Sequence, residues 1–225
     1  MKYYAILVAG GSGNRMQSMV AKQFLLLNGK PVMMHTIEAF HRSSLNPEIL
    51  VVLNKQQHLY WTELCNLHHF KVPHQVIEGG EQRFHSVKNG LDSIHGDGYV
   101  AVHDAVRPLV SPELITRCFV EAKKRGNAVV AIKPTDSIRK LAHDHQSIAL
   151  NRDDFALVQT PQTFNVEELK KCYEVDFTNQ FTDDASVLEY SGHRIHLIEG
   201  ERDNLKITYP EDLEIANVLI KKRGF

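Results

Sequence analysis

Short apolar runs alternate with amphipathic stretches along most of this chain. Residues 5–8, 49–53 and 128–132 are continuous and rich in branched side chains, as is typical of parallel strands buried on both faces. Apolar residues of 31–41 recur three and four positions apart, which predicts a helix. This alternation predicts an α/β fold with a mostly parallel sheet flanked by helices.

The remaining elements follow from weaker patterns. Further strands are predicted at 75–77, 99–102, 196–198 and 205–207, and further helices at 56–67, after 80, at 112–124, from 166, before 190 and from 210. The order breaks between 133 and 154, where the extended pieces 136–139 and 147–150 flank a polar turn and indicate a hairpin. A hairpin does not stabilise itself, so it must pack on this subunit or on another one. The chain is interpreted as one domain, 1–225, with this β-arm at 133–154 inserted in it.

The first strand runs into a glycine-rich loop that carries two cations. Gly10, Gly11 and Gly13 permit positive φ and let main-chain N–H groups approach a phosphate closely. Arg15 and Lys22 follow; a guanidinium can fork onto two phosphate oxygens, whereas an ammonium acts as a mobile point charge. The stretch therefore predicts an anion site, with a tight turn bearing ordinary surface cations as the alternative.

Two common glycine motifs do not fit this loop. A dinucleotide fingerprint needs a third glycine where this chain has Met16, and an acidic residue where the second strand ends in Asn54-Lys55. A mononucleotide P-loop needs Ser or Thr directly after its lysine, but Gln23 follows Lys22.

Other loops fall at the carboxyl ends of predicted strands, where parallel sheets hold ligands. Gly79-Gly80 leads into a helix that contains Ser86. Main-chain groups and the serine hydroxyl could recognise the edge of a nucleotide base there, and a plain glycine turn is the equally favoured alternative. Asp104 and Arg107 leave another strand; they can pair with each other or hold a polar substrate, and we favour substrate. Thr182 or Asp183 is expected to cap a helix whose N-terminus can also attract an anion.

Composition excludes several classes of function. The net charge of −1 argues against nucleic acid as the main partner. No apolar run approaches the roughly 18 residues of a membrane span, and the N-terminus lacks the order of a signal peptide. Three widely spaced cysteines fit reduced thiols, so we expect a cytoplasmic protein. The thirteen histidines show no zinc-ligand spacing, and no protein metal site is predicted.

Six motifs, in order over nearly the whole chain, carry a resemblance. They are AGGSGNRM…KQF, GGEQRFHSV, HDAVRP, QTPQTF, FTDDASVLEYSG and NLKITYPEDL. Together they resemble the 2-C-methyl-D-erythritol 4-phosphate cytidylyltransferase family of the non-mevalonate isoprenoid pathway. The resemblance implies a Rossmann-like nucleotidyltransferase fold, a homodimer that swaps a β-arm, and transfer of CMP from CTP to a polyol phosphate. It also implies Mg²⁺, held mainly by the CTP phosphates.

The resemblance assigns roles to matching positions. Arg15 and Lys22 match stabilisers of the transition state, and Gly80 and Ser86 match the cytosine-reading pair. The positions along the nucleotide are Ala9, Gly10 and Gly11, with Gly13 in the same loop. The positions around the polyol phosphate are Asp104, Arg107, Thr160, Thr182 and Lys206. Ser137 and Arg152 match arm residues that reach the partner subunit's site.

Three departures bear on the acceptor. The chain has Gly10 and Val106 where the family usually has alanine, and Ser137 where threonine is usual. Ribitol-5-phosphate cytidylyltransferases have motifs similar to AGG and HDAVRP. The methylerythritol branch is the one that FTDDASVLEYSG resembles. We expect 2-C-methyl-D-erythritol 4-phosphate, with ribitol 5-phosphate as the alternative. A sugar-1-phosphate nucleotidyltransferase and a non-catalytic nucleotide sensor are the remaining alternatives.

The chemistry of the reaction explains why several matching positions carry cations. A phosphate monoester has a second pKa of about 6, so it is largely dianionic at neutral pH and needs no protein base to attack. What opposes reaction is the approach of two anions and the charge growing on the leaving pyrophosphate. Arg15, Lys22, Arg152 and Lys206 meet that need.

Overall fold

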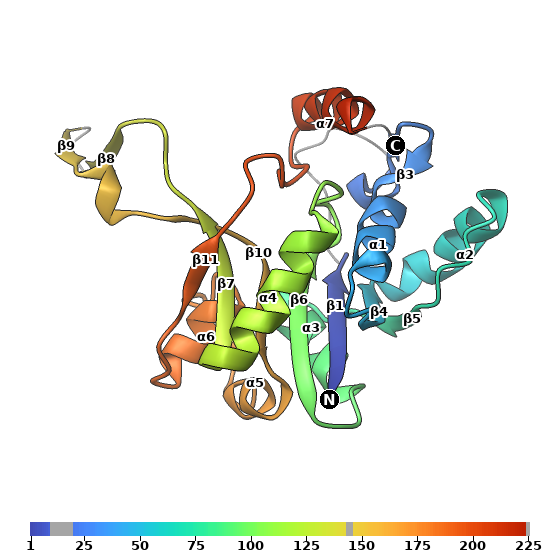
Figure 1. Ribbon diagram of the computed structural model, residues 1–225, viewed down its shortest axis with the longest axis horizontal. Helices are drawn as coiled ribbons and strands as arrows, with labels where there is room; N and C mark the ends of the chain where they lie inside the picture. The colour runs from blue at the N-terminus through green and yellow to red at the C-terminus, as the bar shows by residue number, and fades with distance from the viewer. Residues whose placement is uncertain (10–19, 143–145, 224–225) are drawn as a thin grey trace.

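A seven-stranded sheet forms the centre of the protein. The computed structural model describes residues 1–9, 20–142 and 146–223, and its main sheet has the order β11-β7-β10-β6-β1-β4-β5 (Figure 1). The strands are β1 (Lys2–Val8), β4 (Glu48–Leu53), β5 (Gln75–Glu78), β6 (Gly98–Asp104), β7 (Asn127–Ile132), β10 (Leu157–Asn165) and β11 (Leu197–Glu199). Neighbours pair in parallel except β10, which runs antiparallel to β6 and β7. The predicted mostly parallel α/β sheet is confirmed.

Helices cover both faces of this sheet because its central strands are apolar on both sides. In β1, Ala5 and Leu7 belong to one buried cluster and Tyr4 and Ile6 to another, as the two-residue period of a strand requires. The first cluster packs under α1 (Val32–Arg42), α2 (His58–Leu67) and α4 (Pro112–Arg125). The second packs under α3 (Arg83–Asp92), α5 (Val166–Cys172) and α6 (Asp184–Tyr190).

A smaller third cluster closes the end of the molecule above the sheet. It joins Leu27 of the short strand β2 (Leu26–Leu27), which pairs with β3 (Lys30–Pro31), to the last helix, α7 (Pro210–Lys222). Three single-turn 3₁₀ helices, η2 (Lys22–Phe24), η3 (Lys55–Gln57) and η4 (Arg152–Asp154), complete the described elements. None of the described helices has the length and apolar character needed to cross a membrane.

One strand was missed by the sequence analysis, and one was predicted where none forms. β10 was missed because its interior residues, Gln159, Thr160, Gln162 and Thr163, are polar although they are buried. The strand predicted at 205–207 is an irregular segment instead. Its apolar pattern reflects the packing of Leu205 and Ile207 on the third cluster, and Ile207 N–H donates to the carbonyl of Val106 at 2.9 Å.

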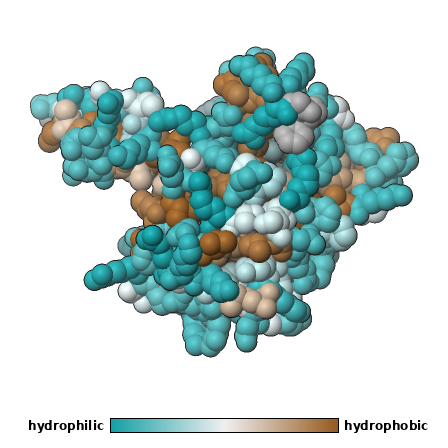
Figure 2. All heavy atoms as spheres, in the orientation of Figure 1, coloured by the Kyte–Doolittle hydropathy of each residue, from teal (hydrophilic) through white to brown (hydrophobic). Residues whose placement is uncertain are grey.

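The predicted hairpin is present as an arm that projects from the body (Figure 1). Its strands β8 (Ile138–Leu141) and β9 (Ser147–Leu150) pair antiparallel in a sheet of their own. Leu141 and Ile148 on the arm are 80% and 64% exposed. Figure 2 shows further apolar surface at the foot of the arm, where Phe155, Leu157, Val158 and Leu197 are exposed. Such an extended apolar area is typical of an interaction surface.

Candidate active site

A polar cavity of about 330 Å³ lies at the carboxyl ends of β1, β5 and β6. This is the edge at which parallel sheets bind ligands, and the volume is at the lower end for small-molecule sites. Of the predicted site residues, it is lined by Ala9, Lys22, Gly80, Ser86, Asp104 and Lys206. The predicted positions Gly10, Gly11, Gly13 and Arg15 lie outside the described residues.

Lys22 is placed by the buried glutamine that follows it. Gln23 is 1% exposed, and its Nε2 donates to the carbonyl of Ala9 at 2.9 Å and to Oε1 of Gln57 at 3.0 Å. These bonds tie the single turn η2 to the end of β1 and to η3. The sequence analysis used Gln23 only to exclude a P-loop and missed this function, for which an isolated glutamine gives no signal.

The paired glycines and Ser86 form one compact loop. Gly80 N–H donates to Ser86 Oγ at 3.1 Å, and Gly79 N–H donates to the carbonyl of Leu53 at 2.9 Å. A methyl group on Gly80 would stand 2.3 Å from Cβ of His85 and 2.9 Å from its backbone carbon. Glycine is therefore required, because the loop lies directly on the first turn of α3.

Asp104 is the centre of the opposite wall. Its Oδ2 accepts a hydrogen bond from Arg107 Nε and forms an ion pair with Lys206 Nζ, each at 3.1 Å. Burial alone would raise the pKa of Asp104, but the cations of Lys206, Arg83 and Arg107 hold it well below its usual range. The carboxylate thus stays ionised. The mutual pairing of Asp104 and Arg107, one of the two roles weighed from the sequence, is present.

Thr160 lies beneath Asp104, buried against the sheet. Its Oγ1 accepts from Asp104 N–H at 3.1 Å and contacts His103 Nδ1 at 3.0 Å. His103 Nε2 faces the carbonyl of Arg107 at 3.4 Å, so Nε2 carries the proton and Nδ1 accepts. Burial lowers the pKa of His103 to about 3, with Arg107 and Lys206 acting in the same direction and Asp104 opposing them. Neutral His103 and Thr160 hold the backbone of the Asp104 loop in place.

Arg83 is a cavity residue that the sequence analysis did not select. Its guanidinium forks onto Asp184, with Nη1–Oδ1 and Nη2–Oδ2 distances of 2.9 and 2.6 Å. Tyr173 donates its hydroxyl to the same carboxylate at 2.6 Å. Burial opposes the charge on Arg83, but Asp184 raises the pKa of Arg83 above its ordinary value. The bridge joins the first turns of α3 and α6, and a pair 101 residues apart leaves no trace in sequence spacing.

Of the described residues predicted for the site, Arg107 and Thr160 contact Asp104 without lining the cavity, and three others lie away from it. Thr182 is exposed before α6, and Asp183 caps that helix by accepting from Ser186 N–H at 2.9 Å. Ser137 is exposed at the start of the arm. Arg152, in η4 at the other end of the arm, donates to the carbonyl of Thr135 at 2.7 Å.

The donor chemistry of the cavity suits a metal ion held mainly by a ligand. Within the described ranges, no three His, Cys, Asp or Glu side chains gather into a metal site. The cavity does present the carboxylates of Asp104 and Glu81, and Mg²⁺ commonly combines one or two carboxylates with substrate phosphates.

Comparison with known proteins gives a consistent result. The family model described as IspD, 2-C-methyl-D-erythritol 4-phosphate cytidylyltransferase, matches residues 3–222. The enzyme of that name from Bacteroides fragilis is 49% identical over 216 residues, which are 96% of this chain and 98% of the relative.

Solved structures agree with the sequence comparison. A 4-diphosphocytidyl-2C-methyl-D-erythritol synthase from Anaerococcus prevotii superposes with a TM-score of 0.84 at 26% identity, covering 98% of this chain and 96% of that one. The 2-C-methyl-D-erythritol 4-phosphate cytidylyltransferase from Thermus thermophilus has a TM-score of 0.79 at 27% identity, covering 98% of this chain and all of its own.

Proposed function

This chain belongs to the 2-C-methyl-D-erythritol 4-phosphate cytidylyltransferase family, and we propose that its cavity transfers CMP from CTP to 2-C-methyl-D-erythritol 4-phosphate. The products are 4-diphosphocytidyl-2-C-methyl-D-erythritol and pyrophosphate, in the non-mevalonate route to isoprenoids. The observation that carries the proposal is the gathering of Lys22, the Gly80–Ser86 loop and the Asp104–Lys206 pair around one cavity.

The reaction needs cations and alignment rather than a protein base. An oxygen of the acceptor phosphate attacks the α-phosphorus of CTP, and the bond from that phosphorus to the bridging oxygen breaks and releases pyrophosphate. The acceptor phosphate is largely dianionic at neutral pH, since its second pKa is about 6. Holding the two anions in line supplies most of the acceleration. Lys22 and Lys206 bring positive charge to the cavity, and Arg15 adds a guanidinium for the triphosphate.

The Gly80–Ser86 loop is the part that selects cytosine. Its main-chain groups and one hydroxyl are held rigidly by the hydrogen bond between Gly80 and Ser86. Cytosine differs from uracil in carrying an exocyclic amine, and a site built to bond an amine rejects an analogue that lacks it.

Mg²⁺ fits the site as a companion of CTP. The triphosphate is its main ligand, with Asp104 and Glu81 as the nearby carboxylates. Bound there, it neutralises charge that develops on the phosphates. Asp104 already contacts Arg107 and Lys206, which favours a metal held mainly by the nucleotide.

The arm completes the site across a homodimer. Leu141 and Ile148 would be covered by a second subunit, and the foot of the arm offers further apolar surface. Ser137 and Arg152 then reach the partner's cavity rather than their own. We propose that the reaction takes place in the cytoplasm, because the three free cysteines would stay reduced there.

Pyrophosphate release across CTP, UTP, ATP and GTP tests the nucleotide part of this function. With acceptor and Mg²⁺ present, CTP should exceed each of the others by at least about tenfold, with a ceiling near 10⁴ for a lost hydrogen bond. The Lys22→Ala variant is the control for enzyme-dependent release. Turnover of UTP within tenfold of CTP would reject a cytosine-reading role for the Gly80–Ser86 loop.

A further inference from the structure

The segment that brings Lys206 to the cavity has no regular secondary structure, yet one buried side chain fixes it. Asn204, two residues before Lys206, is fully buried. We propose that Asn204 is a positioning residue that holds Arg107 and Lys206 in register around Asp104 for the acceptor phosphate. This inference rests on the proposed function and assigns Asn204 no direct contact with substrate.

Asn204 is bonded to the sheet through its side chain. Its Nδ2 donates to the carbonyl of Thr160 at 2.8 Å and approaches Oε1 of Gln159 at 3.4 Å. Both acceptors belong to β10, the rigid strand between β6 and β7. The irregular segment is thereby anchored on the same residue, Thr160, whose hydroxyl accepts from the backbone of Asp104.

The backbone of Asn204 is also bonded to Arg107, the residue that pairs with Asp104. Its carbonyl accepts from Arg107 Nη1 at 2.8 Å, while Arg107 Nε donates to Asp104. Lys206 returns to the same carboxylate oxygen at 3.1 Å. The contacts form a closed ring from Asp104 through Arg107 and Asn204 to Lys206, so a shift of Asn204 displaces both cations.

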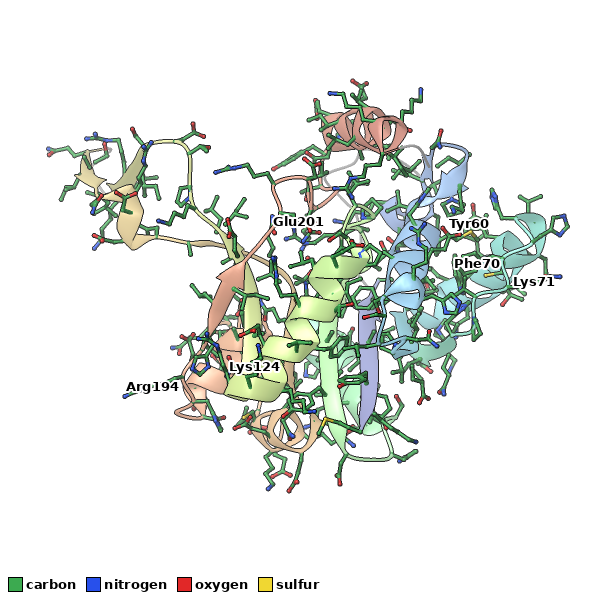
Figure 3. The ribbon with its side chains drawn as sticks, in the orientation of Figure 1. Tyr60, Phe70, Lys71, Lys124, Arg194 and Glu201 are labelled. Atoms are coloured by element: carbon green, nitrogen blue, oxygen red, sulfur yellow. The ribbon has the colours of Figure 1, made fainter. Side chains whose placement is uncertain are left out.

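The turn before Asn204 has contacts that do not need the Asn204 side chain. The Glu201 carboxylate accepts from the hydroxyl and N–H of Ser111 at the start of α4, and the Glu201 carbonyl accepts from Gln159 Nε2 at 3.0 Å. Figure 3 shows Glu201 at the upper end of α4, above the sheet. Loss of the Asn204 amide should therefore loosen the path to Lys206 without releasing the whole segment.

The chain provides a matched control at the other end of the sheet. Asn127 is also buried; its Nδ2 donates to the carbonyl of Arg194 at 2.9 Å and its Oδ1 accepts from His196 N–H at 2.8 Å. Figure 3 shows Arg194 at the lower end of the molecule, opposite Glu201. Asn127→Ala removes similar hydrogen bonds from a similar depth, but far from the cavity.

The test compares Asn204→Ala and Asn204→Leu with Asn127→Ala and wild type. Leucine keeps the volume of asparagine and removes its donor, so it separates hydrogen bonding from packing. Both Asn204 variants should lower kcat/KM for the acceptor by about tenfold or more, while KM for CTP changes by less than about twofold. Asn127→Ala should lower Tm about as much as Asn204→Ala does. It should leave kcat/KM for the acceptor and KM for CTP within about twofold of wild type.

Three results would overturn the proposal. They are an unchanged kcat/KM for the acceptor in Asn204→Leu, an equal loss for CTP and acceptor, and the same kinetic loss in Asn127→Ala. If Asn204→Ala does not fold, Asn204→Leu and the milder Asn204→Ser carry the comparison. Failure of the proposed function is distinct, because wild type itself would then show no acceptor-dependent release of pyrophosphate.

Discussion

The charge of each cavity side chain is set by the groups packed around it. Asp104 remains an anion in a buried position because three cations face it. His103 beside it remains neutral because burial, together with the cations of Arg107 and Lys206, disfavours its protonated form. The sequence offered mutual pairing of Asp104 and Arg107 as the alternative to the favoured substrate-binding role, and the pair is present. The network below them could not be predicted, because Thr160 and Asn204 are brought there by tertiary structure alone.

His103 should make the protein less stable in mild acid. Its pKa falls from 6.5 in the unfolded chain to about 3 in the fold, so stability is fully present above pH 6.5 and is lost as the pH falls below it. At pH 5 the loss from this residue should be about 2 kcal/mol relative to pH 7. Urea unfolding at both pH values measures it. His103→Gln keeps a donor and an acceptor but does not titrate, so its unfolding free energy should fall by about 2 kcal/mol less than that of wild type between pH 7 and pH 5. The same pH dependence in the variant and in wild type would contradict the assignment.

Among the elements, those with apolar periodicity could be predicted and those with buried polar residues could not. β1, β4 and β7 are continuous apolar runs, and α4 begins at Pro112 as predicted, with Ser111 as its N-cap. β10 was missed because its buried residues are polar, and tertiary contacts stabilise them: Gln162 donates to Asp183 and Gln159 donates to the carbonyl of Glu201. The irregular segment at 205–207 was predicted as a strand because its alternate residues, Leu205 and Ile207, are apolar. They pack in the third cluster, which includes residues of α7.

The Arg83–Asp184 bridge should hold the first turns of α3 and α6 together. Asp184→Asn leaves the guanidinium without its carboxylate, and breaking such a buried pair costs about 3 kcal/mol, at the lower end of the usual range because Arg83 is partly exposed. Urea unfolding measures the loss. Lys171→Ala, which breaks the exposed pair with Glu167, is the control and should cost much less, because water screens an exposed ion pair. Equal losses in the two variants would contradict a structural role for the bridge.

At the scale of the whole molecule, the projecting arm is the feature that a single subunit does not explain. The hairpin was predicted from the break in the strand–helix order, and the family resemblance adds the prediction that its residue Arg152 reaches the partner subunit's cavity. In the monomer, Arg152 bonds to Thr135 at the base of the arm and does not line the cavity. Its proposed role in the partner's site therefore needs a test in mixed dimers.

Subunit mixing provides that test. Arg152→Ala and Lys22→Ala are each expected to be inactive alone, and a mixed dimer carries one site with both residues intact. Random exchange of equal amounts should restore about a quarter of wild-type activity, because half of the dimers are mixed and each has one working site. Exchange is verified with two differently tagged subunits. No recovery after verified exchange would refute action of Arg152 across the dimer.

The central claim is transfer of the cytidylyl group to 2-C-methyl-D-erythritol 4-phosphate, and steady-state kinetics with two acceptors test it most directly. At matched CTP and Mg²⁺, kcat/KM is measured for this acceptor and for D-ribitol 5-phosphate. The acceptors differ by a branching methyl and by chain length, so the preference should be roughly tenfold to two-hundredfold for the methylerythritol substrate. A higher kcat/KM for ribitol 5-phosphate would contradict the claim.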